Sequence, residues 1–170
     1  MENNNFLNMA KEIKLQLSYL RRDFHENPEL GFELYRTSSK VKEFLTRENI
    51  EYVESAQTGV TALIRGNGNK TIGLRADMDA LPLMDKKSCE YASKVPGKMH
   101  ACGHDAHTTI LLGVAKILNS VKESLNGNVK LFFEPAEETY GGARLMIKEG
   151  ALENPHVDAI LGLHVDENIE

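Results

Sequence analysis

The sequence predicts an α/β fold, because short apolar runs with strand character alternate with longer segments whose apolar residues recur at helical spacing. Strands separated by helices favour a layered architecture in which at least part of the sheet is parallel. A chain of 170 residues is the usual size of one domain. Strands are expected at residues 60–65, 71–76, 129–133 and 157–163, and helices over about 9–25, from about 37, from 105 and over 141–148.

The N-terminal part of the chain is predicted to form two helices. The first has one apolar face, made of Ile13, Leu17, Leu20 and Phe24. It ends at Asn27-Pro28, because a residue before proline avoids the helical conformation. The second begins near Thr37, and its apolar face is made of Val41, Phe44 and Leu45.

Two strands come next, at residues 60–65 and 71–76, and we expect them to pair as a hairpin. The connection between them contains Gly66-Asn67-Gly68-Asn69, and both residue types favour tight turns. Residues 77–104 are expected to be irregular, and a loop of that length suggests a function. The helix over 141–148 is expected to close at Gly150.

Composition limits the possible functions. The chain is 41% hydrophobic and 26% charged, as is usual for a globular protein, and its formal net charge is −5. No basic run is present, which argues against nucleic-acid and anionic-lipid partners. No apolar run approaches the roughly 20 residues of a membrane span, and the first ten residues do not look like a signal peptide. Two cysteines make no disulfide framework, so we expect a cytoplasmic protein with a free thiol.

Residue types that carry chemistry gather where predicted strands end. Asp77 and Asp79 follow the strand at 71–76, and in an extended chain their side chains would point the same way. Taken alone, this pair is an ordinary charged junction. Glu137 and Glu138 follow the strand at 129–133, where adjacent carboxylates repel each other unless a cation is present. By itself this pair is about as well explained by an exposed acidic turn.

The segment from His100 to His107 contains three histidines, one cysteine and one aspartate. Cys102 and His104, two positions apart, can reach one cation, which would keep the thiol deprotonated. Asp105 can cap the following helix and orient a ligand histidine. His107 lies within that helix and is as well explained by packing or support as by metal ligation.

His164 ends the strongly apolar strand at 157–163. A single histidine there is more often a satisfied core residue, but four strand ends that each bring acids or metal-binding groups favour a metal site. A competing interpretation makes Cys102 a nucleophile paired with His104 or His107. His25 and His156 lie in polar, surface-like contexts, and no role is assigned to them.

Five stretches together resemble a known family: LRRDFHENPELGFE, GLRADMDALPL, MHACGHDAHTTILLGVA, FFEPAEETYGGARLMIKEGAL and DAILGLHV. The family is that of the metal-dependent aminoacylases and carboxypeptidases. The similarity is to its N-acyl amino acid amidohydrolases, which include hippurate hydrolases, N-acetyldiaminopimelate deacetylases and plant hydrolases of auxin–amino acid conjugates. The stretches cover most of the chain in the family's order. Glu134 departs from the glutamine usual before that proline.

The resemblance implies an α/β/α layered, zinc-peptidase-like catalytic domain that hydrolyses the amide bond of small N-acyl amino acids. It implies two divalent metal ions, zinc or manganese first, with cobalt or nickel also admissible. It makes Glu137 the general base and Asp77 and Asp79 an acidic pair near the metals, without deciding which of the two orients the site. The metal ligands that it implies are Cys102, His104, Glu138 and His164.

The end of the chain departs from the resemblance. Members of the family are roughly twice this length or more, with a lid or dimerisation domain and a further histidine ligand after the strand of His164. We therefore expect residues 1–170 to be the N-terminal segment of the catalytic domain, incomplete at its C-terminus. The chain alone is expected to have little or no activity, or to be an inactive metal-binding remnant, and the full-length form to be a homo-oligomer.

Overall fold

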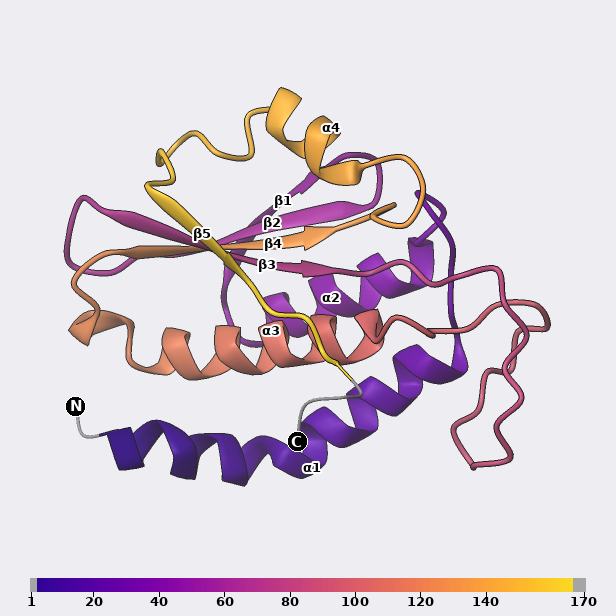
Figure 1. The fold of residues 1–170 in the computed structure, drawn as a ribbon. Coiled ribbons are helices and arrows are strands. Elements are labelled where there is room, and N and C mark those ends of the chain that lie inside the picture. Colours follow the sequence, from indigo (N-terminus) through magenta and orange to yellow (C-terminus); the bar gives the residue numbers. More distant parts are fainter. Residues whose placement is uncertain (1–2, 167–170) are drawn as a thin grey trace.

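The computed structural model describes residues 3–166. Within that range the strands form one mixed sheet in the order β1-β2-β4-β3-β5 (Figure 1). The strands are β1 (Glu51–Ser55), β2 (Gly59–Ile64), β3 (Thr71–Asp77), β4 (Asn128–Glu134) and β5 (Ala159–Gly162). The helices are α1 (Asn3–Glu26), α2 (Tyr35–Arg47), α3 (His104–Ser120) and α4 (Gly142–Lys148), with a short 3-10 turn at Lys122–Ser124.

Part of the sheet is parallel, as the alternation of strands and helices predicted. Strand β3 lies between β4 and β5 and runs parallel to both, whereas β1, β2 and β4 pair antiparallel. The carboxyl ends of β3, β4 and β5 therefore meet at one edge of the sheet, which is where ligand sites of α/β proteins usually lie. The predicted α/β class and the partly parallel sheet are confirmed.

The predicted hairpin between residues 60–65 and 71–76 is wrong, because β4 lies between β2 and β3. The polar connection at residues 65–70 is long enough to cross the roughly 10 Å between strands two places apart. The observed hairpin joins β1 and β2 instead. Its turn contains Ala56 and Gln57, which both have positive φ (47° and 67°) although neither is a residue type that favours such a turn.

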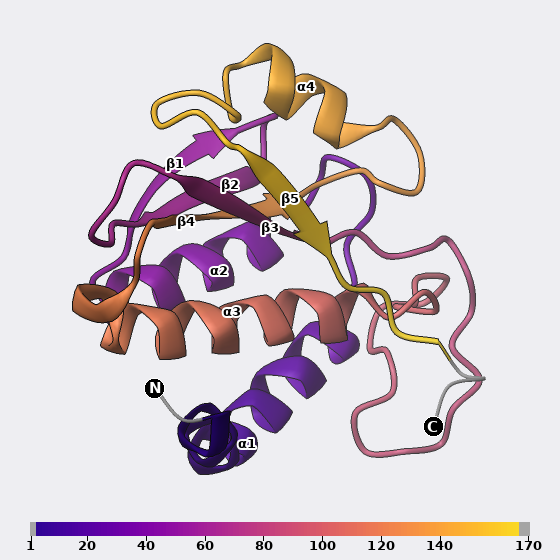
Figure 2. The ribbon, with the colours of Figure 1, turned by 60° about the vertical axis from the view of Figure 1, so that its left-hand side comes forward.

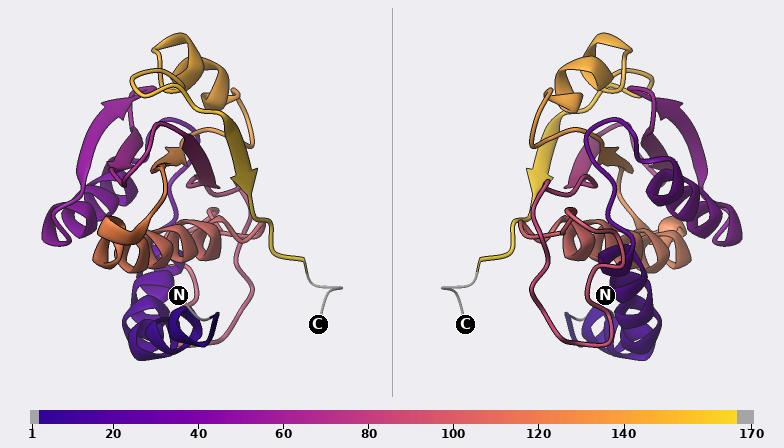
Figure 3. Two further views of the ribbon diagram at one scale, coloured as in Figure 1. Left: turned by 90° about the vertical axis from the view of Figure 1, so that its left-hand side faces the viewer. Right: turned by 90° about the vertical axis from the view of Figure 1, so that its right-hand side faces the viewer.

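Helices cover both faces of the sheet. Helices α2 and α3 pack on one face, α1 packs on α3, and α4 lies on the opposite face (Figures 1 and 3). The larger core lies between the sheet and α2 and α3, and includes Phe24, Leu45, Leu112, Leu131 and Phe133. A smaller core under α4 contains Ala56, Phe132, Met146, Ala151 and Val157. The layers are those of an α/β/α sandwich, as expected.

The long irregular segment is also confirmed. Between the end of β3 and the start of α3, residues 78–103 contain no helix or strand and extend from one side of the molecule (Figure 2). Backbone hydrogen bonds attach this loop to the end of α1 and the segment after it, from Lys94 N–H to Glu26 O and from Ala80 N–H to Glu29 O (both 2.8 Å). No helix among the described residues has the length and apolar character that crossing a membrane requires.

Candidate metal centre

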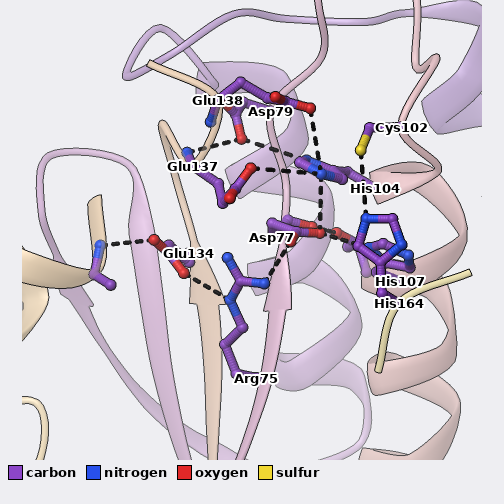
Figure 4. Close-up of polar contacts among 12 residues, drawn as sticks. Arg75, Asp77, Asp79, Cys102, His104, His107, Glu134, Glu137, Glu138 and His164 are labelled. Atoms are coloured by element: carbon purple, nitrogen blue, oxygen red, sulfur yellow. Dashed lines mark hydrogen bonds and ion pairs between the residues drawn. The ribbon is translucent and has the colours of Figure 1, made fainter. Parts of the chain in front are cut away.

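Side chains of types that bind metal ions converge at the carboxyl edge of the sheet from four parts of the fold (Figure 4). Candidate ligand atoms of Cys102, His104 and His164 all lie within 4.8 Å of one another. The same holds for the ligand atoms of His104, Glu137 and Glu138. His104 belongs to both groups and therefore lies at the middle of the cluster.

His104 is buried and lacks the hydrogen bonds that a buried imidazole normally makes. Its side chain is 1% exposed, and neither ring nitrogen has a hydrogen-bond partner. Nε2 lies 3.5 Å from Asp77 Oδ1 and 3.6 Å from Glu138 Oε1, and that glutamate oxygen is also without a partner. Buried polar atoms in proteins are nearly always satisfied. A cation between these atoms would satisfy both the imidazole and the carboxylate.

The charges around His104 also favour a cation at this position. Burial disfavours its charged form, but the carboxylates of Asp79 and Asp77 outweigh that effect and raise the pKa of the ring. Nδ1 of His104 faces Asp79 Oδ1 at 3.5 Å, while Nε2 faces the other carboxylates. The neighbourhood is thus rich in negative charge and favours positive charge at its centre.

The turn after β4 directs the two glutamates into the site. Pro135 follows the strand, Ala136 adopts a positive φ of 55°, and the Asp79 carboxylate accepts hydrogen bonds from the backbone N–H groups of Glu137 (3.0 Å) and Glu138 (3.2 Å). Gly142 is required in this turn, because a Cβ at that position would overlap the Pro135 carbonyl. Sequence reasoning found both glutamates but could not find their backbone link to Asp79.

The two glutamates differ in exposure. The Glu137 side chain is 40% exposed and that of Glu138 is 19% exposed. Partial burial raises the pKa of Glu137, and the neighbouring Glu138 carboxylate raises it further. A carboxylate that is accessible and more basic than usual is suited to accept a proton.

The Cys102 thiol faces the imidazole of His164. Its Sγ is 3.4 Å from His164 Nε2, and His164 Nδ1 lies 2.7 Å from the Val165 carbonyl, to which it can donate. Burial raises the pKa of the Cys102 thiol to about 11, and Glu138 adds to the effect. Without a cation, this thiol is therefore protonated at neutral pH.

Asp105 does not cap α3, contrary to expectation. The N-cap position is Gly103, whose φ is 88° and which makes no side-chain capping bond. The Asp105 carboxylate instead forms an ion pair with Arg21, whose Nε lies 2.8 Å away, and pairs with His25 Nδ1 at 2.7 Å. Because those partners lie 80 or more positions earlier in the chain, local capping rules could not reveal them.

The assignment of His25 to a surface-like context is wrong as well. Its side chain is 1% exposed and lies between Asp105 and Asp85, whose Oδ2 is 3.5 Å from His25 Nε2. Nearby His100 is also buried, neither of its ring nitrogens has a partner among the described residues, and burial lowers its pKa to about 4. His156, by contrast, is 72% exposed, in agreement with its surface-like context.

Arg75 is a site residue that the sequence patterns do not identify. Its guanidinium donates from Nε to Glu134 Oε2 (2.6 Å) and from Nη1 to Asp77 Oδ2 (2.5 Å). Arg75 and Asp77 are two apart on β3, a spacing that puts side chains on one face of a strand, and Glu134 is the register partner of Asp77 on β4. The spacing of Arg75 and Asp77 can be seen in the sequence. The proximity of Glu134 follows only from the pairing of β3 with β4.

All of the predicted site residues lie in one cluster, and none is remote from the rest. They are Asp77, Asp79, Cys102, His104, Glu137, Glu138 and His164. His107 also lies within it, since Asp77, His104 and His107 form a third group of atoms within 4.8 Å of one another.

Comparisons with known proteins agree with the fold. The sequence profile described as peptidase family M20/M25/M40 matches residues 73–169. An IAA-amino acid hydrolase (ILR1-like 5) from Arabidopsis thaliana is 49% identical over 95% of this chain and 37% of its own length. A hippurate hydrolase from Campylobacter jejuni is 45% identical over 90% of this chain and 40% of its own length. The chain therefore spans about two fifths of these relatives.

A solved structure gives the same result. The YXEP protein of Bacillus subtilis, described as a dinuclear metal-binding peptidase of the M20 family, superposes with a TM-score of 0.89 at 41% sequence identity. The match covers 94% of this chain and 45% of that protein. These findings confirm the resemblance that the five sequence stretches indicated.

Proposed function

The chain belongs to the peptidase family M20/M25/M40, and we propose that it supplies the metal centre of an enzyme that hydrolyses the amide bond of N-acyl amino acids. One observation carries this proposal: a thiol, a second imidazole and two carboxylates converge around the imidazole of His104. The buried ring nitrogens of His104 have no hydrogen-bond partner. In this proposal the described residues form the metal-binding N-terminal part of the catalytic domain.

The proposed ligands are Cys102, His104, Glu138 and His164, which would hold two divalent cations. A thiolate and imidazoles suit zinc, whereas the carboxylates also admit manganese, cobalt or nickel. Once bound, such cations would lower the pKa of a water molecule and polarise the acyl carbonyl of the substrate. The unsatisfied atoms of His104 and Glu138 support the fit of this donor set to a cation.

Glu137 is proposed as the general base. It accepts a proton from the attacking water and afterwards donates that proton to the nitrogen of the leaving amine. Its partial exposure leaves it accessible, and the raised pKa of its carboxyl brings its basicity closer to what proton transfer near neutral pH requires.

The two aspartates have separate proposed roles. Asp79 holds the backbone of Glu137 and Glu138 and faces His104 Nδ1, so it orients both the base and a ligand. Asp77, paired with Arg75, lies beside His104 Nε2 and contributes negative charge to the cation site. We therefore propose that Asp79, and not Asp77, orients the glutamate turn.

A thiol amidase is less well supported. Cys102 and His164 lie at contact distance, as a nucleophile and its base would. However, an efficient thiol nucleophile needs a lowered pKa, and burial together with Glu138 raises the pKa of Cys102 to about 11. The same acidic surroundings that disfavour a free thiolate favour a cation.

The proposed substrate is a small N-acyl amino acid, the compound class common to the names of the two relatives. We further propose a cytoplasmic location, since both cysteines are free thiols, which a reducing compartment preserves. Association into a homo-oligomer remains a proposal based on the family resemblance.

The test uses the protein as its gene encodes it, loaded with zinc or manganese. Amine release is measured from N-acetyl, N-benzoyl and indole-acetyl amino acids, before and after chelation and after restoring the metal. Activity that is lost on chelation and returns with metal supports the proposal. Activity that survives chelation but is abolished by an alkylating agent would overturn it in favour of the thiol amidase. The same assay on the 170-residue chain tests the expectation that it has little activity alone.

A further inference from the structure

We propose that His107 is a positioning residue that holds His164 beside Cys102, by accepting a hydrogen bond from the backbone N–H of the residue after His164. This inference rests on the proposed function, because His164 is one of the proposed ligands. Its direct evidence is independent of any metal: Val165 N–H donates to His107 Nε2 at 2.9 Å.

The hydrogen bonds fix the tautomer of His107. A backbone N–H can only donate, so Nε2 of His107 must be the unprotonated, accepting nitrogen. The proton of the neutral ring then lies on Nδ1, which is 2.6 Å from Asp77 Oδ1 and donates to that carboxylate. Both ring nitrogens are therefore used within the protein, although His107 lies close enough to Asp77 and His104 to be mistaken for a ligand.

The acceptor end of this link is rigid. His107 and Asp77 are both buried, with 1% of each side chain exposed. Arg75 binds the second oxygen of Asp77, and Thr108 Oγ1 donates to the Asp77 carbonyl at 2.8 Å. Asp77 thus holds His107 in a fixed orientation from the end of strand β3.

The segment that is held lies beyond the last strand of the sheet. Strand β5 ends at Gly162, and residues 163–165 follow it with exposed side chains. Val165 packs against Gly103, where a Cβ would overlap its methyl group. The His107 and His164 rings meet edge to face with their centres 4.7 Å apart. A hydrogen bond at residue 165 therefore determines where the imidazole of residue 164 stands.

Two substitutions each remove one of the two hydrogen bonds of the His107 side chain and keep the other. In His107→Gln the side-chain oxygen can replace Nε2 and accept from Val165, but the Asp77 contact is lost. In His107→Asn the amide can replace Nδ1 and donate to Asp77, but nothing accepts from Val165. The positioning role predicts that His107→Asn weakens zinc binding by about 10-fold to 100-fold and that His107→Gln binds several-fold more tightly than His107→Asn.

The first experiment is a long-range ¹H–¹⁵N spectrum of the histidine rings in the protein as its gene encodes it, without metal and with zinc. We expect His107 to be protonated at Nδ1 in both states, and zinc to shift the His164 Nε2 signal but neither nitrogen of His107. A zinc-induced shift at His107 typical of coordination would overturn the inference by making His107 a ligand. Failure of zinc to shift any histidine would instead contradict the proposed function.

The second experiment is a zinc titration of the two His107 variants by calorimetry, with His156→Asn as the exposed control. Urea unfolding of each variant verifies that it is folded. Weak binding in His107→Asn, several-fold tighter binding in His107→Gln and normal binding in the control support the inference. Equal zinc affinity in folded His107→Asn and wild-type protein would refute it, while leaving the proposed metal centre intact.

Discussion

The carboxylate of Asp79 accepts a hydrogen bond from the backbone N–H of Glu137 at 3.0 Å, although 58 positions separate the two residues. Its second oxygen accepts from the next backbone N–H, that of Glu138. An aspartate two residues beyond the end of β3 therefore sets the direction of the turn that follows β4. This contact is the reason that a carboxylate outside the proposed ligand set is expected to affect catalysis.

Asp79→Asn should lower kcat about 10-fold to 100-fold and reduce stability by about 1–3 kcal/mol. Asparagine offers one oxygen, so its NH₂ group would face one of the two backbone N–H groups. Steady-state kinetics and urea unfolding measure the two effects. The matched control is Asp158→Asn, since Asp158 also accepts a backbone N–H, from Thr71 at the opposite end of β3. Equal effects on kcat in the two variants would contradict the role given to Asp79.

Glu137→Gln should leave metal content unchanged and lower turnover by about 10²–10⁴-fold, because glutamine cannot accept the proton. Glu138→Gln should lose metal as well as activity. Elemental analysis and initial rates distinguish the two outcomes, with exposed Glu43→Gln as the control. If Glu137→Gln lost metal together with activity, Glu137 would be a ligand and not the base.

Alkylation of Cys102 should be slow at neutral pH in the metal-free protein. The thiolate is the reactive form, and raising the pKa from 9.0 to about 11 lowers its population about 100-fold at pH 7. The rate should therefore rise about tenfold per pH unit until the pH approaches 11. Iodoacetamide labelling of a Cys89→Ser variant, followed by mass spectrometry, measures it. An alkylation rate that has already reached its plateau at pH 8 would show that the pKa of the Cys102 thiol is not raised.

His25→Ala should destabilise the protein by about 2–4 kcal/mol, because Asp105 would lose a buried partner and a cavity would remain. His156→Ala, at an exposed histidine, should change stability by less than about 0.5 kcal/mol. Urea unfolding measures both changes. Indistinguishable stabilities of the two variants would mean that the His25–Asp105 contact contributes nothing.

Local sequence patterns predicted the elements better than their pairing. The helix of Phe24 ends where Asn27-Pro28 requires, and the alternation of strands and helices gave the correct class. The prediction of strand pairing failed at the expected hairpin. The insertion of β4 between β2 and β3 depends on contacts between segments more than 50 residues apart, which local patterns do not reveal. The observed hairpin turn at Ala56 and Gln57 has no turn residues to identify it.

The site was predictable to the extent that its residues are adjacent in sequence. Cys102 and His104 stand out because they lie in a short segment with two further histidines and an aspartate, whereas Glu137 and Glu138 gain weight only together with the other strand ends. Arg75 and His25 do not stand out, since their importance comes from partners on other elements. A buried histidine with a distant aspartate partner looks the same in sequence as an exposed one, which is why His25 was assigned to the surface.

The most direct test of the metal centre is a crystal structure of the zinc-soaked protein with anomalous diffraction data collected at the zinc edge. We expect anomalous peaks about 2.0–2.3 Å from Cys102 Sγ and from the nearest nitrogens of His104 and His164, with Glu138 completing the ligand set. Well-ordered zinc found only elsewhere on the chain, with those side chains present and unliganded, would contradict the central claim.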